Sequence, residues 1–340
     1  MMGAVHRYIR RPWLVTAGLL LLVAGSARFL RHDRPSESAS RGEAAVPHRL
    51  SARPARPFAM VVSLAPDDSF KHVVLAPLGA PDGPRFVTPL TCERVYYAGS
   101  RGLCLESRST GSGSATHMAH VFDEQFERLR RLTLTGPPSR TRLSPDGRRA
   151  AFTVFDEGHS YADGIFSTRT TIIDTAAGDV IGDLESWSIT RDGRPFVNRD
   201  FNFWGVTFAS DGNRFFATLR SQGRYYLIEG DVDARTAHVV LQGGECPSLS
   251  PDQTRVAFKR RLGGSQGWWQ LAVLDLVTND VHPLAGDTES VDDQVEWLDA
   301  GHLLYFRPGA QGNVVWVLAT QGDSAPEPFA RDAFSPAIVR

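Results

Sequence analysis

From residue 58 onward the chain consists of short hydrophobic runs of strand length, separated by turn residues. Their β-branched and aromatic residues are typical of β-strands. Beyond residue 58, no stretch of twelve residues repeats its apolar positions at the helical period of 3.6, and the best helical candidate, Gln125–Arg131, is short. The pattern therefore predicts an all-β body. The clearest strand candidates are Val61–Val62, Val73–Leu75, Val95–Tyr97, Thr170–Ile173, Tyr225–Ile228 and Val314–Leu318.

One strand–turn–strand pattern recurs along this body. Three copies are Arg142–Phe152, Thr207–Ala217 and Ser248–Phe258, and Glu296–Tyr305 is a decayed fourth. In the first copy, the Ser-Pro-Asp-Gly sequence at residues 144–147 has the residues that a type I turn favours. The aspartates of these turns are therefore expected to form turns and not to catalyse. A second pair of strands follows each hairpin, so the repeats predict propeller blades of four antiparallel strands.

The length of the body predicts six such blades. Its 283 residues give about 47 residues per blade, a normal size for four strands. One strand at the C-terminal end, Phe334–Val339, and three at the N-terminal end, near Ala59–Leu64, His72–Ala76 and Arg85–Thr88, are expected to form one blade together. Such a blade closes the ring and hides its last sheet edge. The other five blades are expected at 91–135, 136–198, 199–243, 244–290 and 291–332.

These Ser-Pro-Asp-Gly blade repeats resemble those of the TolB-like six-bladed β-propellers, and most of all the membrane-anchored actinobacterial members of unassigned function. The resemblance covers residues 58–340. It implies a six-bladed β-propeller that binds a partner. The N-terminal α/β domain of the Tol-system protein has no counterpart, since residues 31–57 cannot supply it. The resemblance therefore implies a binding propeller without implying membership of a Tol-type system.

The first 30 residues have the layout of a signal-anchor or a signal peptide. Arg7, Arg10 and Arg11 precede the uncharged run Pro12–Ala27, which contains four consecutive leucines. This run is shorter than the roughly 20 residues that span a bilayer comfortably, but flanking arginines extend its reach by snorkelling. Because basic residues stay on the cytoplasmic side, we expect one uncleaved hydrophobic helix with the body outside the cytoplasmic membrane. The alternative is cleavage after the small residues 24–27 and secretion.

Charge and composition divide the chain into three parts: the helix at 1–30, a linker at 31–57 and the propeller at 58–340. The linker is rich in Arg, Pro, Ser and Ala without apolar periodicity, so we expect it to be disordered. Residues 1–57 hold ten Arg and three acidic residues, whereas the body holds 27 basic and 35 acidic residues. An acidic body argues against a general nucleic-acid binder.

Several short motifs are better explained by the fold than by catalysis or metal binding. The sequence Gly-Gly-Ser-Gln-Gly at 263–267 matches a nucleophile pattern, but it lies between two predicted strands, and a nucleophile elbow needs a strand-to-helix turn. His117 and His120 are three apart on a predicted strand and so point to opposite faces. The chain has no phosphate-cradling Gly-Lys-Ser/Thr motif. Of the adjacent Trp268 and Trp269, one is expected to face outward.

Acidic residues gather where the innermost strands begin, around the predicted central channel. Carboxylates that converge there from consecutive blades would attract a cation or a basic partner, and such oxygen ligands suit Ca²⁺ or Mg²⁺. The alternative is that nearby arginines, such as Arg94, Arg142 and Arg199, neutralise them. The candidate ligand-binding residues are Glu245, Asp292, Asp293, Asp200 and Arg142.

The three cysteines are too few for a disulfide-dense scaffold or a four-cysteine zinc site. Cys92 and Cys104 flank a predicted turn near 99–102, and an outside location would permit a disulfide between them. If the turn of this hairpin is centred at Ala98, the two cysteines lie opposite each other on paired strands. If it is centred between residues 100 and 101, they are out of register. Cys246 is then expected to be a free, buried thiol.

Taken together, these features predict an extracytoplasmic, membrane-tethered propeller that acts as a non-catalytic binding scaffold in the cell envelope. Its expected partner is an envelope protein or peptide, and the propeller itself is expected to be monomeric. Two alternatives stay open: a hydrolase or lyase that uses the central funnel, and a sensor of cell wall or peptides. Perturbed carboxylates or a histidine in the funnel would favour the enzyme, and an apolar rim patch would favour protein binding.

Overall fold

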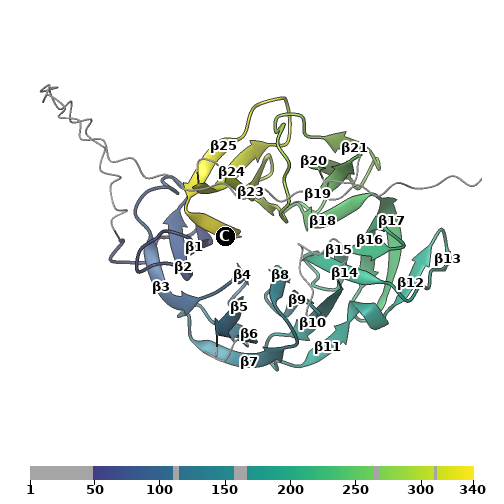
Figure 1. Cartoon of the computed structure of the whole chain (residues 1–340), viewed down its shortest axis with the longest axis horizontal. Coiled ribbons are helices and arrows are strands. Elements are labelled where there is room, and N and C mark those ends of the chain that lie inside the picture. Colours follow the sequence, from purple (N-terminus) through teal and green to yellow (C-terminus); the bar gives the residue numbers. More distant parts are fainter. Residues whose placement is uncertain (1–48, 110–114, 157–166, 264–267, 310–311) are drawn as a thin grey trace, which may run out of the picture. The chain divides into compact units, whose positions relative to one another are not determined.

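The computed structural model describes residues 49–109, 115–156, 167–263, 268–309 and 312–340. Six sheets are arranged in a ring around a central axis, with one strand of each sheet at the centre (Figure 1). This arrangement confirms the predicted all-β, six-bladed propeller with four-stranded antiparallel blades. The predicted N-terminal helix lies outside the described residues. Within the described ranges, no helix has the length and apolar character needed to cross a membrane.

The first three blades contain the N-terminal half of the body, and their strands are named from the innermost outward. Blade 1 consists of β26 (Ala333–Val339), β1 (Phe58–Ser63), β2 (His72–Pro77) and β3 (Phe86–Thr91). Blade 2 consists of β4 (Arg94–Ala98), β5 (Arg101–Ser109), β6 (Ala115–Phe122) and β7 (Arg128–Leu134). Blade 3 consists of β8 (Pro138–Leu143), β9 (Arg149–Phe155), β10 (Thr168–Asp174) and β11 (Val180–Asp183).

The other three blades complete the ring in the same order. Blade 4 consists of β14 (Asn202–Phe208), β15 (Arg214–Ser221), β16 (Arg224–Asp231) and β17 (Thr236–Gln242). Blade 5 consists of β18 (Gly244–Leu249), β19 (Arg255–Leu262), β20 (Trp268–Asp275) and β21 (Val281–Pro283). Blade 6 consists of β22 (Glu296–Trp297), β23 (His302–Gly309), β24 (Gly312–Ala319) and β25 (Glu327–Arg331).

Blade 1 joins the two ends of the described body. Strand β26 pairs antiparallel with β1, so that Val339 lies opposite Phe58 and Ala333 lies opposite Ser63. The last strand of the chain is thus the innermost strand of a blade whose other three strands come first in the body (Figure 1). This pairing satisfies backbone groups that would otherwise form open sheet edges.

A short hairpin widens blade 4 beyond the four strands that the repeat predicts. Strand β12 (Ser188–Arg191) pairs parallel with β17, and β13 (Arg194–Pro195) pairs with β12. We expected residues up to 198 to belong to blade 3. Instead, Trp187 and Ile189 are buried in the cluster between blades 3 and 4, and β12 extends the sheet of blade 4 by pairing with β17.

The segment Gln125–Arg131 is not helical, although it was the best helical candidate. The carboxylate of Asp123 accepts hydrogen bonds from the backbone N–H groups of Gln125 and Glu127, both at 2.9 Å, and this holds a tight turn. Phe126 has a left-handed φ of 66°, which a right-handed helix does not allow. Strand β7 begins directly after this turn.

Each interface between neighbouring blades encloses one buried apolar cluster. Between blades 3 and 4, Ile172 and Trp187 pack with Phe203 and Phe215. Between blades 5 and 6, Trp297 and Tyr305 occupy the same kind of position. Because every sheet buries both faces against its neighbours, the hydrophobic effect stabilises the ring as a whole and not one central core.

The aspartates of the repeated turns shape those turns, as the sequence predicts. Asp146 accepts hydrogen bonds from the Ser144 hydroxyl at 2.6 Å and from the Arg148 backbone at 3.0 Å. In the third copy, Asp252 accepts from the Ser250 hydroxyl at 2.5 Å and from the Thr254 backbone at 3.1 Å. Both carboxylates are therefore committed to local structure.

Candidate functional site

The six innermost strands run in the same direction along the central axis, so the channel between them has two different ends. We call the end at which these strands begin the amino end, and the end at which they finish the carboxyl end. A cavity of about 380 Å³ lies at the carboxyl end, a hollow of about 610 Å³ at the amino end, and a gap of only about 20 Å³ between them. The channel is therefore narrowed to a waist.

Bulges in three of the innermost strands connect the walls of the channel. Gly205 in β14, Cys246 in β18 and Ser335 in β26 have left-handed φ values of 68°, 51° and 53° at places where the strand register shifts. A Cβ on Gly205 would come within 2.9 Å of the Cα of Cys246, so the two strands approach closely only because residue 205 is glycine. The bulged backbone N–H of Cys246 donates to the Thr218 hydroxyl of the previous blade at 2.7 Å.

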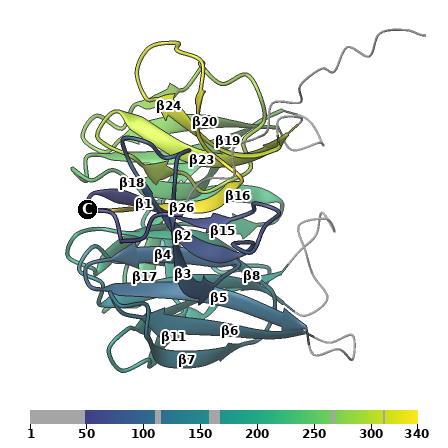
Figure 2. The same cartoon turned by 90° about the vertical axis from the view of Figure 1, so that its left-hand side faces the viewer.

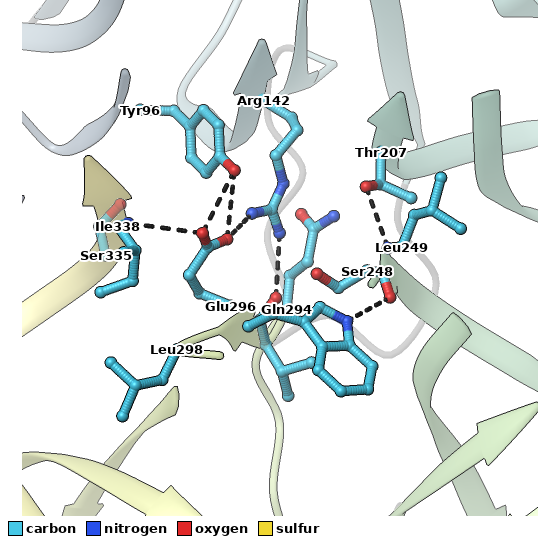
Figure 3. A network of polar contacts seen from close by, with 12 residues as sticks. Tyr96, Arg142, Thr207, Ser248, Leu249, Gln294, Glu296, Leu298, Ser335 and Ile338 are labelled. Carbon is cyan, nitrogen blue, oxygen red and sulfur yellow. Dashed lines mark hydrogen bonds and ion pairs between the residues drawn. The ribbon is translucent and has the colours of Figure 1, made fainter. Parts of the chain in front are cut away.

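A buried ion pair closes the waist. Arg142 of β8 binds the carboxylate of Glu296 of β22 across the channel, and it also donates to the backbone oxygen of Val295 at 3.0 Å (Figure 3). The Tyr96 hydroxyl donates to the same carboxylate at 3.2 Å, and the Ile338 N–H lies 3.4 Å from it (Figure 3). Four blades thus converge on one carboxylate.

The electrostatics of the waist favour a fixed, charged pair. Burial, together with the Glu296 carboxylate, raises the pKa of Tyr96 to about 12, so Tyr96 stays a neutral donor. Although burial opposes it, the neighbouring Glu296 carboxylate raises the pKa of Arg142. Removing either partner would leave a buried charge without its counterion, which is strongly destabilising.

Gln294 and Trp297 extend the waist toward blades 4 and 5. The Gln294 side-chain amide donates to the backbone oxygens of Val206 at 3.1 Å and Pro247 at 2.8 Å. The Trp297 indole N–H donates to the backbone oxygen of Ser248 at 2.9 Å. These bonds hold the short inner strand β22 in place, because β22 itself has only two residues in its ladder.

The carboxyl-end cavity takes its walls from every blade. The waist pair Arg142 and Glu296 lines its floor, and Arg56 and Arg340 line it from the two ends of the described body. Ser210 and Ser250 also line it, and their hydroxyl groups are hydrogen-bonded to Gln253 and Asp252. The six innermost strands contribute, in chain order, Ala98, Leu143, Phe208, Leu249, Trp297 and Val339.

At the amino end, the predicted carboxylates are paired with basic side chains. Glu245 accepts from Arg261 at 2.9 Å and from the Trp269 indole at 3.0 Å, and Asp292 binds the buried Lys259. Although burial alone would raise it, the pKa of Asp292 is lowered, mainly by Lys259. The structure thus matches the alternative in which cations neutralise these carboxylates, although Lys259 and Arg261 were not among the arginines we named.

The other two predicted carboxylates do not join Glu245 and Asp292. Asp293 accepts the Phe306 N–H at 2.9 Å and lies 3.9 Å from Arg94, so it points away from its neighbour Asp292 as strand geometry predicts. Asp200 accepts from the Ser221 hydroxyl at 2.7 Å, within blade 4. In the described part of the chain, no three His, Cys, Asp or Glu side chains are grouped closely enough to hold a metal ion.

The cysteines and the two neighbouring histidines belong to separate local structures. Cys92 and Cys104 form a disulfide with a Cα–Cα distance of 5.5 Å, across the β4–β5 hairpin, and Cys246 is free and buried. His117 lies 2.8 Å from the Ser107 hydroxyl, whereas His120 lies 3.1 Å from Glu106, and the two histidines do not share a site. The Gly-Ser motif at 264–267 lies outside the described residues.

Sequence reasoning missed Glu296, Tyr96 and Lys259. Glu296 was interpreted only as part of a decayed turn repeat, but it stands at the inner-strand position that follows the Asp292–Gln294 segment. Lys259 is one of only two lysines in the chain, and it follows the apolar run Val-Ala-Phe within β19. A buried cation directly after three apolar residues is the signal that would have indicated a paired carboxylate nearby.

Comparison with known proteins shows a likeness of fold. No family model matches the chain, and no curated protein sequence matches it. A crystal structure of TolB from Acinetobacter baumannii superposes with a TM-score of 0.56 at 16% identity, over 83% of this chain and 66% of that one. A Mycobacterium tuberculosis puromycin-hydrolyzing peptidase gives a TM-score of 0.52 at 14% identity, over 83% of this chain and 45% of that one.

The chain thus spans just under two thirds of the first of these structures and less than half of the second. At such low identity, the likeness concerns the arrangement of the blades and not the chemistry of a site. The chain therefore has the fold of the TolB-like six-bladed β-propellers.

Proposed function

We propose that this protein is a non-catalytic binding module, tethered outside the cytoplasmic membrane, whose carboxyl-end cavity receives an acidic segment of an envelope protein or peptide. The observation that carries this proposal is the cavity of about 380 Å³, which is built by all six innermost strands and closed at the bottom by the Arg142–Glu296 pair. A cavity of this size, with mixed apolar and polar walls, suits a few side chains of a partner.

The charges of the cavity favour an acidic segment. Three basic side chains, those of Arg56, Arg142 and Arg340, line it. Arg142 is paired with Glu296 and Arg56 with Glu124, so of the three only Arg340 has no carboxylate partner among the described residues. A ligand that brings carboxylate or carbonyl oxygens would complement this positive charge.

The composition of the cavity walls argues for binding and against hydrolysis or elimination in this cavity. Among the described residues that line it, there is no histidine, cysteine or lysine. The serines of the cavity therefore have no adjacent base there, and its one carboxylate is held by Arg142. No specific observation favours the hydrolase or lyase.

Two features support a location outside the cytoplasm. The N-terminal sequence has the charge pattern of a signal-anchor, with Arg7, Arg10 and Arg11 before the uncharged run. The disulfide between Cys92 and Cys104 is a bond that persists in oxidising compartments and is rare in the cytosol.

The acidic preference is tested with two fluorescent hexapeptides, one of alternating Glu and Ala and one of alternating Lys and Ala. We expect fluorescence anisotropy to show that the full-length chain binds the acidic peptide at least tenfold more tightly. The substitution Arg56→Gln should weaken this binding several-fold, whereas Arg224→Gln, at an exposed position on β16, should not. Equal binding of both peptides, or tighter binding of the basic one, would contradict the proposal.

The location is tested by membrane fractionation and protease accessibility. We expect the full-length chain to sediment with membranes and its body to be digested in intact spheroplasts. A body that stays protected until lysis would show that the orientation is wrong. A soluble product that begins after residues 24–27 would show that the helix is cleaved and the protein is secreted.

A further inference from the structure

We propose that the amino-end hollow is a second binding site, separate from the carboxyl-end cavity, and that it takes a neutral saccharide. A sugar ring would stack on Trp268, and its hydroxyl groups would donate hydrogen bonds to Asp292 and Glu289. This inference goes beyond the proposed function, because it concerns the opposite end of the channel and another class of ligand.

The hollow presents an aromatic surface to solvent. Its volume is about 610 Å³, within the range of small-molecule sites. Trp268, at the start of β20, is 46% exposed, although a large indole ring is normally withdrawn from water. Phe306 and Phe334 also line the hollow and contact each other edge to face, with ring centroids 4.7 Å apart. The apolar C–H face of a sugar ring packs well on such a flat aromatic side chain.

Trp268 differs from the other exposed large apolar side chains. Among the described residues, Phe70, Val180, Val197 and Val277 are also exposed, but none of them lines a cavity. Its neighbour Trp269 is held in place, because its indole donates to Glu245 and its ring lies 4.8 Å from the Arg261 guanidinium. Because the backbone at Trp268 is held by its fixed neighbour Trp269, the exposed ring of Trp268 is positioned to contact a ligand.

Two carboxylates in the hollow are exposed to a ligand although each has a basic partner. Lys259 binds Oδ1 of Asp292, and Arg140 also contributes to the lowered pKa of this carboxyl group. The Arg307 guanidinium lies 3.3 Å from Oε2 of Glu289, and no described residue contacts its Oε1. The two side chains are 43% and 68% exposed, so these carboxylates are accessible acceptors.

The charge balance of the hollow favours a neutral ligand that is rich in hydrogen-bond donors. Three arginines and three acidic residues line the hollow, so it has no net charge from its side chains. Lys259 pairs with Asp292, and Arg307, which binds the buried Asp287 at 2.7 Å, also lies 3.3 Å from Glu289. A cationic ligand would compete with these two basic side chains, and an anionic ligand would face the exposed carboxylate oxygens. Hydroxyl groups can use the remaining lone pairs without either cost. Sugars combine such hydroxyls with an apolar face.

The proposal is tested by isothermal titration calorimetry on the full-length chain, purified in a detergent without a sugar headgroup. The probes are three neutral trisaccharides, namely cellotriose, chitotriose and mannotriose, together with trigalacturonate and trilysine. We expect saturable binding of at least one neutral trisaccharide and weaker binding of both charged probes. Trp268→Ala should weaken the binding at least tenfold, and Glu289→Gln should weaken it several-fold.

The matched control is Phe70→Ala, which removes an exposed aromatic ring outside the hollow and should leave the affinity unchanged. Circular dichroism of each variant reports whether its fold is retained. No saturable binding of any neutral trisaccharide at 10 mM, equal affinity in Trp268→Ala, or tighter binding of trilysine would each overturn the proposal. These outcomes do not depend on the acidic peptide, so either proposal can fail while the other holds.

Discussion

The two ends of the channel are built from the same six strands but in different ways. At the carboxyl end, the innermost strands finish in repeated tight turns, such as Ser144–Gly147, and the cavity has an excess of basic side chains. At the amino end, the strands are preceded by connections of unequal length, and Lys259, Arg307 and their carboxylate partners balance one another. The waist pair Arg142–Glu296 separates the two (Figure 3).

The difference shows how one repeated scaffold can carry two unlike surfaces. A side view places the C-terminus at one face of the ring (Figure 2), the face that the carboxyl-end cavity opens onto. The repeated turn, found in blades 3 to 6, gives that face a regular rim. The connections at the other face are free to vary in length without disturbing the blades.

Removal of β26 should have the largest effect on stability, because this strand closes the ring and lines both ends of the channel. Deletion of residues 334–340 leaves β1 without its inner partner and opens the ring. We expect loss of cooperative urea unfolding, followed by circular dichroism, and aggregation of the product. Arg340→Ala, which keeps the strand, should unfold cooperatively. A truncated chain as stable as the full-length one would mean that β26 is not needed to hold the ring closed.

Disruption of the Arg142–Glu296 pair at the waist should cause the second largest loss of stability. Glu296→Gln leaves the buried Arg142 without its counterion and should lower the free energy of unfolding by about 3–5 kcal/mol. The double variant Arg142→Met, Glu296→Leu removes both charges and should recover most of this loss. If urea titrations show that Glu296→Gln lowers the free energy of unfolding by less than about 1 kcal/mol, the ion pair is not an important structural element of the waist.

A carboxylate on the amino-end side of blade 3 should give a stability that falls as pH rises. Burial raises the pKa of Glu185 to about 8 from 4.5, so the native state binds a proton between these values that the unfolded state has lost. Glu185→Gln should therefore stabilise the protein by about 1–3 kcal/mol at pH 8, and its advantage should vanish near pH 4.5. A pH-independent difference between variant and parent would refute this assignment.

A turn aspartate at the carboxyl end should show the opposite pH dependence, with a smaller effect. The Ser250 hydroxyl lowers the pKa of Asp252 to about 2, so its contribution is present above pH 3.8 and is lost as pH falls toward 2. Asp252→Asn should cost about 0.5–1 kcal/mol at pH 7. The cost should disappear in acid, and thermal melts across this range measure it.

Features that depend on local sequence could be predicted, and features that depend on distant contacts could not. The Ser-Pro-Asp-Gly turn at 144–147 and the strand at 334–339 are recognisable from neighbouring residues alone. The pairing of Arg142 with Glu296 joins residues 154 positions apart and arises only when the ring closes. For the same reason, of the four carboxylates named from the sequence only Asp292 and Asp293 line the hollow, and the cations that pair with Glu245 and Asp292 are not those named.

The extra hairpin of blade 4 illustrates the same limit. The repeat predicts where blade 3 ends. The local sequence around Trp187 and Ile189, however, is equally compatible with packing on the sheet of blade 3 or on that of blade 4. The aromatic-rich interior of blade 4, with Phe203 and Phe215, decides the outcome. Such competition between two interfaces is decided by tertiary packing and not by strand propensity.

The most direct test of the central claim is site-specific photocrosslinking from the two ends of the channel in living cells. A photoreactive amino acid replaces Gln253 at the carboxyl-end cavity, Pro308 at the amino-end hollow, or the exposed Val277 as a control. Our account predicts a discrete protein or peptide crosslink from residue 253, with an acidic sequence at the crosslinked site, and none from residues 308 and 277. Protein crosslinks from residue 308 alone, or none from residue 253, would contradict it.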